Sequence, residues 1–158
     1  MPRDDIINDV SALGGLPFFV VASATLVAAT PALDRTKLGL MFALGLAACY
    51  GVTTLIRHLW FVPRPQPVEH AVWWQKLDAS SFPSLHAMRA AFLATVLVTL
   101  FRSFVLAIPA VAIVLGVAWV RVHKKHHRTM DVVAGIIIGC ILGILSLVLL
   151  AAFPLWFG

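Results

Sequence analysis

A cluster of basic and histidine residues between two long apolar segments has the clearest capacity for chemistry in this sequence. Residues 121–131 read Arg-Val-His-Lys-Lys-His-His-Arg-Thr-Met-Asp and combine four cations, three histidines and one carboxylate. Ionisable groups at a membrane boundary are costly and usually functional. His127 and Asp131 are four residues apart, so on a helix they share a face and the carboxylate can orient the imidazole. A neutral, oriented histidine beside fixed cations suits a phosphoryl group as its partner.

Two further clusters of polar residues precede this one. The first is Arg57, followed after six residues by Arg64-Pro65, and the second is the run Pro-Ser-Leu-His at 83–86. A transferring phosphoryl group spreads negative charge over its oxygens, so fixed cations and positioning supply most of the catalysis. We therefore expect the phosphate to be bound by three arginines and by donors at a helix N-terminus. These candidates are Arg57, Arg64 and Arg121, with Ser84 and the backbone N–H of Leu85.

The histidines complete a mechanism of covalent catalysis. His127, oriented by Asp131, is the candidate nucleophile and would form a phosphohistidine intermediate. His86 is the candidate general acid for the leaving oxygen, and then the base that activates water. The sequence has no carboxylate cluster of the kind that holds Mg²⁺, so we expect no metal and no other cofactor. Zinc at His123, His126 and His127 is the less favoured interpretation, because convergent carboxylates are lacking.

Membrane-spanning helices must position these residues. Of the 158 residues, 61% are hydrophobic and 12% are charged, whereas a soluble domain carries about 25% charged residues. The length allows a single domain, residues 1–158. The net charge of +5 is concentrated in short segments between apolar runs, which fits a membrane surface or an anionic ligand. We expect no nucleic acid as a partner.

The apolar runs predict an all-α, multi-pass transmembrane bundle of about five spans. The spans are expected at 11–33, 38–60, from the serines at 80–81 to about 101, at 103–120, and from the histidine cluster to the C-terminus. Residues 4–13 predict a short amphipathic helix at the interface. Ser80 and Ser81 are expected helix N-caps. Gly135, Gly139 and Gly143 predict a small-residue ridge that packs two helices of the same molecule. This topology brings the three clusters to one face.

Together the three clusters resemble the signature of the type 2 phosphatidic acid phosphatase (PAP2) superfamily. That signature pairs basic-x6-Arg-Pro, Pro-Ser-Gly-His and Ser-Arg-x5-His-x3-Asp motifs, and the resemblance covers residues 57–131. Within the family the chain is similar to the small integral membrane lipid phosphatases. The resemblance implies the same roles at the matching positions, and no metal. The chain departs from the pattern at three positions: Arg57 replaces a lysine, Leu85 a glycine and Val120 a serine. The five expected spans are one fewer than the six that are usual in the family.

The sequence thus predicts a metal-independent phosphatase that removes a terminal phosphate from a membrane lipid. A polyprenyl diphosphate is the favoured substrate, and phosphatidate or phosphatidylglycerophosphate is the alternative. A lipid phosphotransferase is a further hypothesis. The non-enzymatic hypothesis is a lipid-phosphate carrier, which needs the cationic pocket but not His127. The expected partners are the lipid substrate and the bilayer, and the oligomeric state is left open.

The side of the cell membrane that the clusters face is also left open by the sequence. Cations are more numerous at the end that holds the clusters, so the positive-inside rule places that end in the cytoplasm. Cations gathered around a phosphate pocket serve the ligand, however, and many members of the family work on the outer face.

Overall fold

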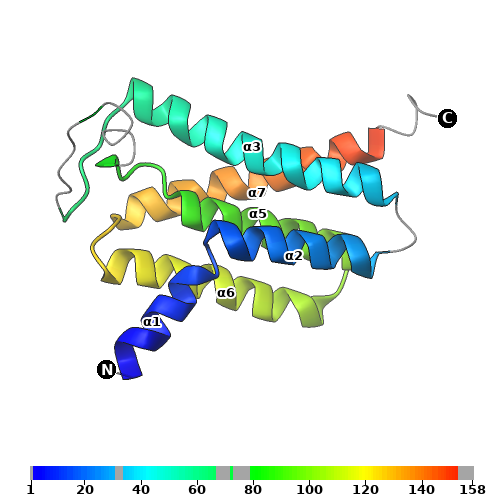
Figure 1. Cartoon of the computed structure of the whole chain (residues 1–158), viewed down its shortest axis with the longest axis horizontal. Coiled ribbons are helices and arrows are strands. Elements are labelled where there is room, and N and C mark those ends of the chain that lie inside the picture. The colour runs from blue at the N-terminus through cyan, green and yellow to red at the C-terminus, as the bar shows by residue number, and fades with distance from the viewer. Residues whose placement is uncertain (1, 31–33, 67–71, 73–78, 153–158) are drawn as a thin grey trace.

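The computed structural model is a bundle whose long helices run side by side (Figure 1). It describes residues 2–30, 34–66, 72 and 79–152, and across these residues it has six helices and no strand longer than one isolated bridge. The all-α class is confirmed. The helices are α1 (Pro2–Ala12), α2 (Leu16–Ala29), α3 (Arg35–Leu59), α5 (Leu85–Phe101), α6 (Phe104–His123) and α7 (Thr129–Ala152).

Among the described helices, α3, α6 and α7 are each long and apolar enough to cross a membrane. Helix α5 is apolar but has 17 residues, and α2 has 14. At 1.5 Å per residue α2 extends about 21 Å, which is less than the roughly 30 Å of a hydrocarbon core. Helices α1 and α2 meet at a bend of 57°, and together they form a broken span or a re-entrant segment. The first predicted span is therefore shorter than expected, and its residues 31–33 lie outside the described ones.

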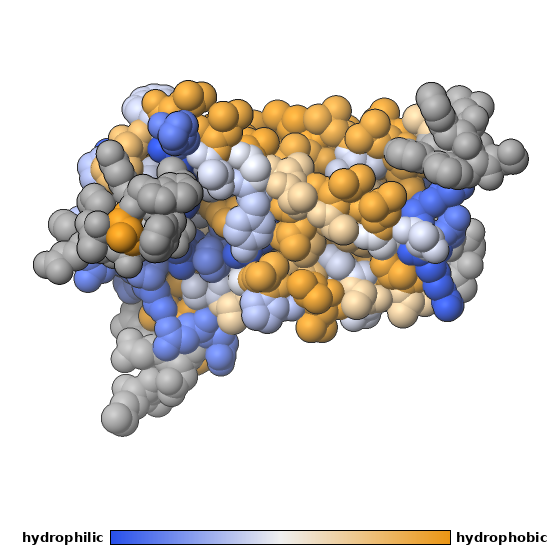
Figure 2. All heavy atoms as spheres, turned by 45° about the horizontal axis from the view of Figure 1, so that its top comes forward, coloured by the Kyte–Doolittle hydropathy of each residue, from blue (hydrophilic) through white to orange (hydrophobic). Residues whose placement is uncertain are grey.

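The surface agrees with a lipid environment. Figure 2 shows hydrophobic residues along the middle of the bundle and hydrophilic residues toward both ends. Large apolar side chains that a soluble protein would bury are exposed there, and an exposed apolar surface of this extent marks a membrane-facing region. Examples on three helices are Leu44, Leu55, Ile108, Val111, Ile141 and Val148. The chain is a membrane protein.

Helix α5 is the centre of the bundle, where it packs against α2, α3, α6 and α7. The Phe92 ring lies 5.7 Å from that of Phe19 on α2 and 6.4 Å from that of Phe42 on α3, measured between centroids. Gly45 makes room for this ring, because a Cβ at that position would lie 2.2 Å from Phe92 Cζ. Because α5 is packed on several sides, its first turns, which carry His86, are held in a fixed position.

The glycine ridge of α7 packs against α5, as the sequence predicts. A Cβ on Gly135 would lie 2.5 Å from the carbonyl oxygen of Ser84, and one on Gly139 would lie 2.2 Å from that of Met88. At Gly143 the nearest atom would be Thr95 Cβ, at 3.0 Å. The ridge therefore joins two helices of the same chain and sets the start of α7 against the start of α5.

Replacing Gly139 by alanine is expected to destabilise the fold. The new methyl group would meet backbone atoms of Met88, which cannot move aside as a flexible side chain can. Overpacking of this kind costs about 1–3 kcal/mol of unfolding free energy. Thermal unfolding in detergent measures the effect, with Gly51→Ala as the control, because Gly51 is exposed and a Cβ there meets nothing within 4 Å. Equal midpoints for the two variants would contradict close packing at the ridge.

Candidate active site

The three polar clusters meet at one end of the bundle, where α3 ends, α5 begins and α6 turns into α7 (Figure 1). The backbone N–H of Ser84 donates to the carbonyl of Asp131 at 2.9 Å, which ties the start of α5 to the start of α7. Nη2 of Arg57, in the last turn of α3, donates to the carbonyl of Pro83 at 3.2 Å. The prediction that the clusters share one face is confirmed.

The segment after α3 is held by backbone hydrogen bonds to Ser81, two residues before the second cluster, and to the third cluster. The N–H of Ser81 donates to the carbonyl of Val62 at 2.7 Å, and the N–H of Gln66 donates to the carbonyl of Lys125 at 3.2 Å. Arg64 lies between these two attachments and is half-buried. The irregular segment thus brings a third arginine to the end of the bundle.

The helix start at the second cluster differs from the prediction. Ser80 and Ser81 do not cap α5, because the helix begins at Leu85 with Ser84 as its N-cap residue. The hydroxyl of Ser80 instead accepts the N–H of Val62 at 3.2 Å. The Ser84 side chain is fully buried, and its Oγ has no hydrogen-bond partner among the described residues. This hydroxyl and the first N–H groups of α5, which have no partner within the helix, are donors available to an anion.

His127 lies in the turn that precedes α7, and its ring is almost completely buried. Its Nδ1 is 2.6 Å from the carbonyl oxygen of Ser81, and its Nε2 is 3.4 Å from Nη2 of Arg121. A carbonyl oxygen only accepts, so Nδ1 must carry the proton of the neutral ring. The lone pair is then on Nε2, directed at a cation.

Asp131 takes a different place from the one predicted for it. Its Oδ2 is 3.9 Å from Nδ1 of His127, which is beyond hydrogen-bonding distance, and it accepts the backbone N–H of Arg128 at 2.7 Å. The group that orients the imidazole directly is the carbonyl of Ser81. Asp131 fixes the first turn of α7 through its hydrogen bond to Arg128. A backbone carbonyl has no side-chain signature, so sequence reasoning missed the contact with Ser81.

The surroundings of His127 keep its ring neutral. Burial, and then the positive charge of Arg121, lower the pKa of His127 to about 3, although the hydrogen bond to Ser81 acts in the opposite direction. The pKa of the neighbouring His126 is also lowered, by partial burial and then by Arg121. A neutral imidazole is the nucleophilic form, so the site holds His127 ready for attack at ordinary pH.

The His127 ring is expected to titrate well below the pH at which a free histidine does. An unfolded histidine has a pKa of about 6.5, so between that pH and about 3 the unfolded chain binds a proton that the folded protein does not. The free energy of unfolding should therefore fall as the pH drops through this window. Nitrogen NMR of ring-labelled protein measures the titration, with His127→Asn to assign the signal. A His127 ring that protonates near pH 6.5 would contradict the buried geometry.

Four arginines surround this end of the described bundle. Arg57 and Arg121 are buried, and the charges of Arg64 and Arg121 act on both His86 and His127. The fourth is Arg89, which lies on α5 one turn after His86 and is buried. The sequence motifs assign no role to Arg89. The sequence does carry a signal for Arg89, because an ionisable residue within an apolar span is a functional candidate by default.

Other residues of the histidine cluster are exposed or contact a neighbouring helix. His123 is exposed and stacks on Trp119, with ring centroids 4.7 Å apart. Lys124 donates to the side chain of Asn8 on α1, and Arg128 is exposed. Within the described residues no three His, Cys, Asp or Glu side chains are placed to hold a metal ion.

Comparison with known protein families identifies the superfamily of this chain. A family model described as the PAP2 superfamily matches residues 37–154, which is most of the chain. The chain belongs to the PAP2 superfamily. It is a membrane phosphatase of that superfamily.

A solved PAP2 structure has the same fold. It is described as the crystal structure of the first transmembrane PAP2 type phosphatidylglycerolphosphate phosphatase, from Bacillus subtilis. The TM-score is 0.69 at 23% sequence identity, over 99% of this chain and 78% of that chain. No curated protein matches the sequence.

Proposed function

We propose that this PAP2 phosphatase removes the terminal phosphate of a membrane lipid through a phosphohistidine intermediate, without a metal ion. The observation that carries the proposal is the geometry of His127. The carbonyl of Ser81 fixes the proton on Nδ1, and the lone pair of Nε2 is directed at the guanidinium of Arg121. A phosphoryl group bound by that guanidinium would lie next to the nucleophile.

The proposed reaction has two steps. In the first, His127 Nε2 forms a bond to phosphorus while the bond to the lipid oxygen breaks, and His86 gives that oxygen its proton. In the second, His86 takes a proton from water, the hydroxide oxygen bonds to phosphorus, and the phosphorus–nitrogen bond breaks. Inorganic phosphate leaves and both histidines return to their starting states. The incoming phosphate supplies the negative charge that allows His86 to hold a proton beside the arginines.

The proposed phosphate site consists of cations and helix donors. Arg57 and Arg121 are buried and Arg64 is half-buried, and each guanidinium offers several N–H donors. The buried hydroxyl of Ser84 and the backbone N–H groups of the first turn of α5, which begins at Leu85, add neutral donors. Leu85 lacks the small size of glycine, and its side chain packs against the core cluster of α2, α3 and α5. Its backbone N–H is retained.

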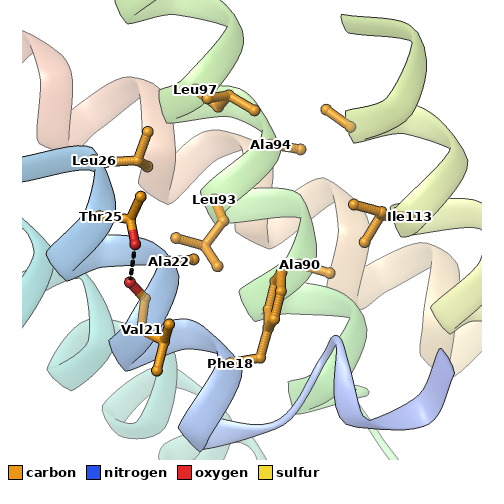
Figure 3. A pocket seen from close by; sticks show the side chains of 11 residues that line it. Phe18, Val21, Ala22, Thr25, Leu26, Ala90, Leu93, Ala94, Leu97 and Ile113 are labelled. Carbon is orange, nitrogen blue, oxygen red and sulfur yellow. Dashed lines mark hydrogen bonds between the residues drawn. The ribbon is translucent and has the colours of Figure 1, made fainter. Parts of the chain in front are cut away.

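An apolar groove beside the site supports a lipid substrate. It has a volume of about 320 Å³ and lies between α2, α5 and α6, where Phe18, Leu93 and Ile113 line it (Figure 3). It begins at Ala90, one helical turn after His86. A hydrocarbon chain lying in this groove would leave its phosphate at the arginine end. The substrate would enter sideways from the bilayer.

Two headgroups should be compared first. The phosphatidylglycerophosphate ester is the substrate named for the structural neighbour from Bacillus subtilis. A polyprenyl diphosphate carries more negative charge, and the described end of the bundle gathers four buried or half-buried arginines. We propose a terminal lipid phosphate as the substrate class, with polyprenyl diphosphate favoured for its charge.

Phosphate release by the detergent-purified protein tests the proposal. The panel would contain polyprenyl diphosphate, phosphatidylglycerophosphate and phosphatidate, each with and without EDTA and vanadate. We expect release from at least one lipid, unchanged by EDTA and inhibited by vanadate, which mimics a five-coordinate phosphorus.

Three outcomes would overturn parts of the proposal. Activity lost in EDTA and restored by Mg²⁺ or Zn²⁺ would overturn the metal-free mechanism. Transfer of the phosphate to another lipid in place of water would indicate a phosphotransferase. Binding of the lipids without release from any of them, by folded protein, would indicate a carrier.

A further inference from the structure

Arg89 is a buried cation with no carboxylate partner among the described residues. Its Nη1 donates to the hydroxyl of Tyr50 on α3 at 2.9 Å, and its Nη2 donates to the backbone carbonyl of Gly14 at 2.8 Å. Its guanidinium carbon also lies 5.5 Å from the centre of the Tyr50 ring. Burying a cation in this way is costly, so the bridge that it makes between three segments requires an explanation.

Gly14 occupies the bend between α1 and α2 and lies directly against His86. A Cβ on Gly14 would be 2.9 Å from Cβ of His86, 3.0 Å from its carbonyl oxygen and 2.9 Å from Cγ1 of Val117. Only glycine fits in this contact. The bend therefore forms a wall beside the first turn of α5. Arg89 donates a hydrogen bond to the backbone carbonyl of Gly14 in that wall.

Helix α1 reinforces the same wall from the other side. It crosses α6, where a Cβ on Gly116 would lie 3.3 Å from Cγ1 of Val10. Lys124 at the end of α6 donates to the side chain of Asn8. The family match begins at residue 37, so the wall is made by residues that precede it.

We propose that Arg89 is a positioning residue that holds the α1–α2 bend against His86 and so keeps His86 aimed at the leaving oxygen. The inference rests on the proposed role of His86 as the general acid. A planar guanidinium suits this task, because its fork of donors reaches Tyr50 and Gly14 at the same time. A lysine carries the charge but delivers it as a compact point, and it cannot reproduce both hydrogen bonds in this geometry.

The test uses leaving groups of different acidity. The substrates are an alkyl phosphate and a nitrophenyl phosphate with an alkyl chain of the same length. Protonation by His86 matters for the poor alkoxide leaving group and hardly at all for the nitrophenolate. Gly14→Ala and Arg89→Lys are therefore expected to lower kcat about 10²-fold for the alkyl phosphate and less than about 3-fold for the nitrophenyl phosphate. KM should change little, because the phosphate-binding arginines are intact.

Controls separate positioning from general damage. Gly39→Ala makes the same chemical change where a Cβ meets nothing within 4 Å, and it should leave both rates unchanged. If Gly14→Ala does not fold, Arg89→Lys and Tyr50→Phe decide the question. Equal losses on both substrates would overturn the inference, because they would show only a structural role for the wall.

His86→Ala distinguishes the two possible failures. If this variant is selective for the leaving group while Gly14→Ala and Arg89→Lys are not, the wall does not position His86 and the inference alone fails. If His86→Ala loses both activities equally, His86 is not the general acid, and the proposed mechanism fails together with the inference.

Discussion

Replacement of His127 by alanine is expected to lower turnover by about 10⁴-fold or more, because the variant loses the atom that bonds to phosphorus. Nε2 of His127 is buried and directed at Arg121, and the ring proton is held on the other nitrogen by Ser81. The measurement is phosphate release together with mass spectrometry of acid-sensitive phosphohistidine after rapid quenching. Wild-type enzyme should carry phosphate on His127 during turnover.

The matched control for this variant lies in the same histidine cluster. His123 is exposed and stacks on Trp119, so His123→Ala should fold normally and retain its activity. A His127→Ala protein that is folded, binds vanadate and still releases phosphate at the wild-type rate would exclude His127 as the nucleophile. Phosphate found on another histidine during turnover would do the same.

Arg121→Gln is expected to reduce kcat/KM by about 10³-fold, which is within the range seen when an arginine that stabilises transferring phosphoryl groups is removed. The guanidinium is buried and contacts Nε2 of His127 at 3.4 Å, so it marks the place where negative charge would develop. Removing the cation should also raise the pKa of His127, since Arg121 is one cause of its depression. Vanadate inhibition should weaken in parallel with the rate.

Two companion variants sharpen the Arg121 experiment. Arg121→Lys retains the charge without the planar fork, so its loss should lie between those of wild type and Arg121→Gln. Arg35→Gln makes the same change at an exposed arginine at the opposite end of α3, and it should have no effect. Activity of Arg121→Gln within a few-fold of wild type would contradict a role for Arg121 in binding the phosphate.

The sequence predicted the parts of the molecule that follow from helix-scale patterns. Apolar runs located α3, α6 and α7, because about 20 apolar residues have few alternatives to spanning a bilayer. Once the helices alternate in direction, Arg57, His86 and His127 must emerge at the same end. The sequence also predicted the glycine ridge, because glycines repeated every four residues line one side of a helix.

Other parts depend on contacts that leave no pattern in the chain. The hydrogen bond from His127 to Ser81 uses a backbone carbonyl, which any residue could supply. The start of α5 was placed too early, because Ser80 and Ser81 look like caps but bond instead to the segment that follows α3. The bend at Gly14 depends on how closely α1 approaches α5 and α6, which is a property of packing between distant segments.

The gathering of the three polar clusters at one end of the bundle has a consequence for how the enzyme uses its substrate pool. An active site at one end of the spanning helices reaches the headgroups of one leaflet only. In sealed vesicles with a single protein orientation, hydrolysis should therefore stop once the facing leaflet is exhausted. It should resume when lipid is allowed to cross the bilayer. The extent of the first phase would then report which leaflet the enzyme reaches, and the rate of the resumed phase would report the rate of transbilayer lipid movement.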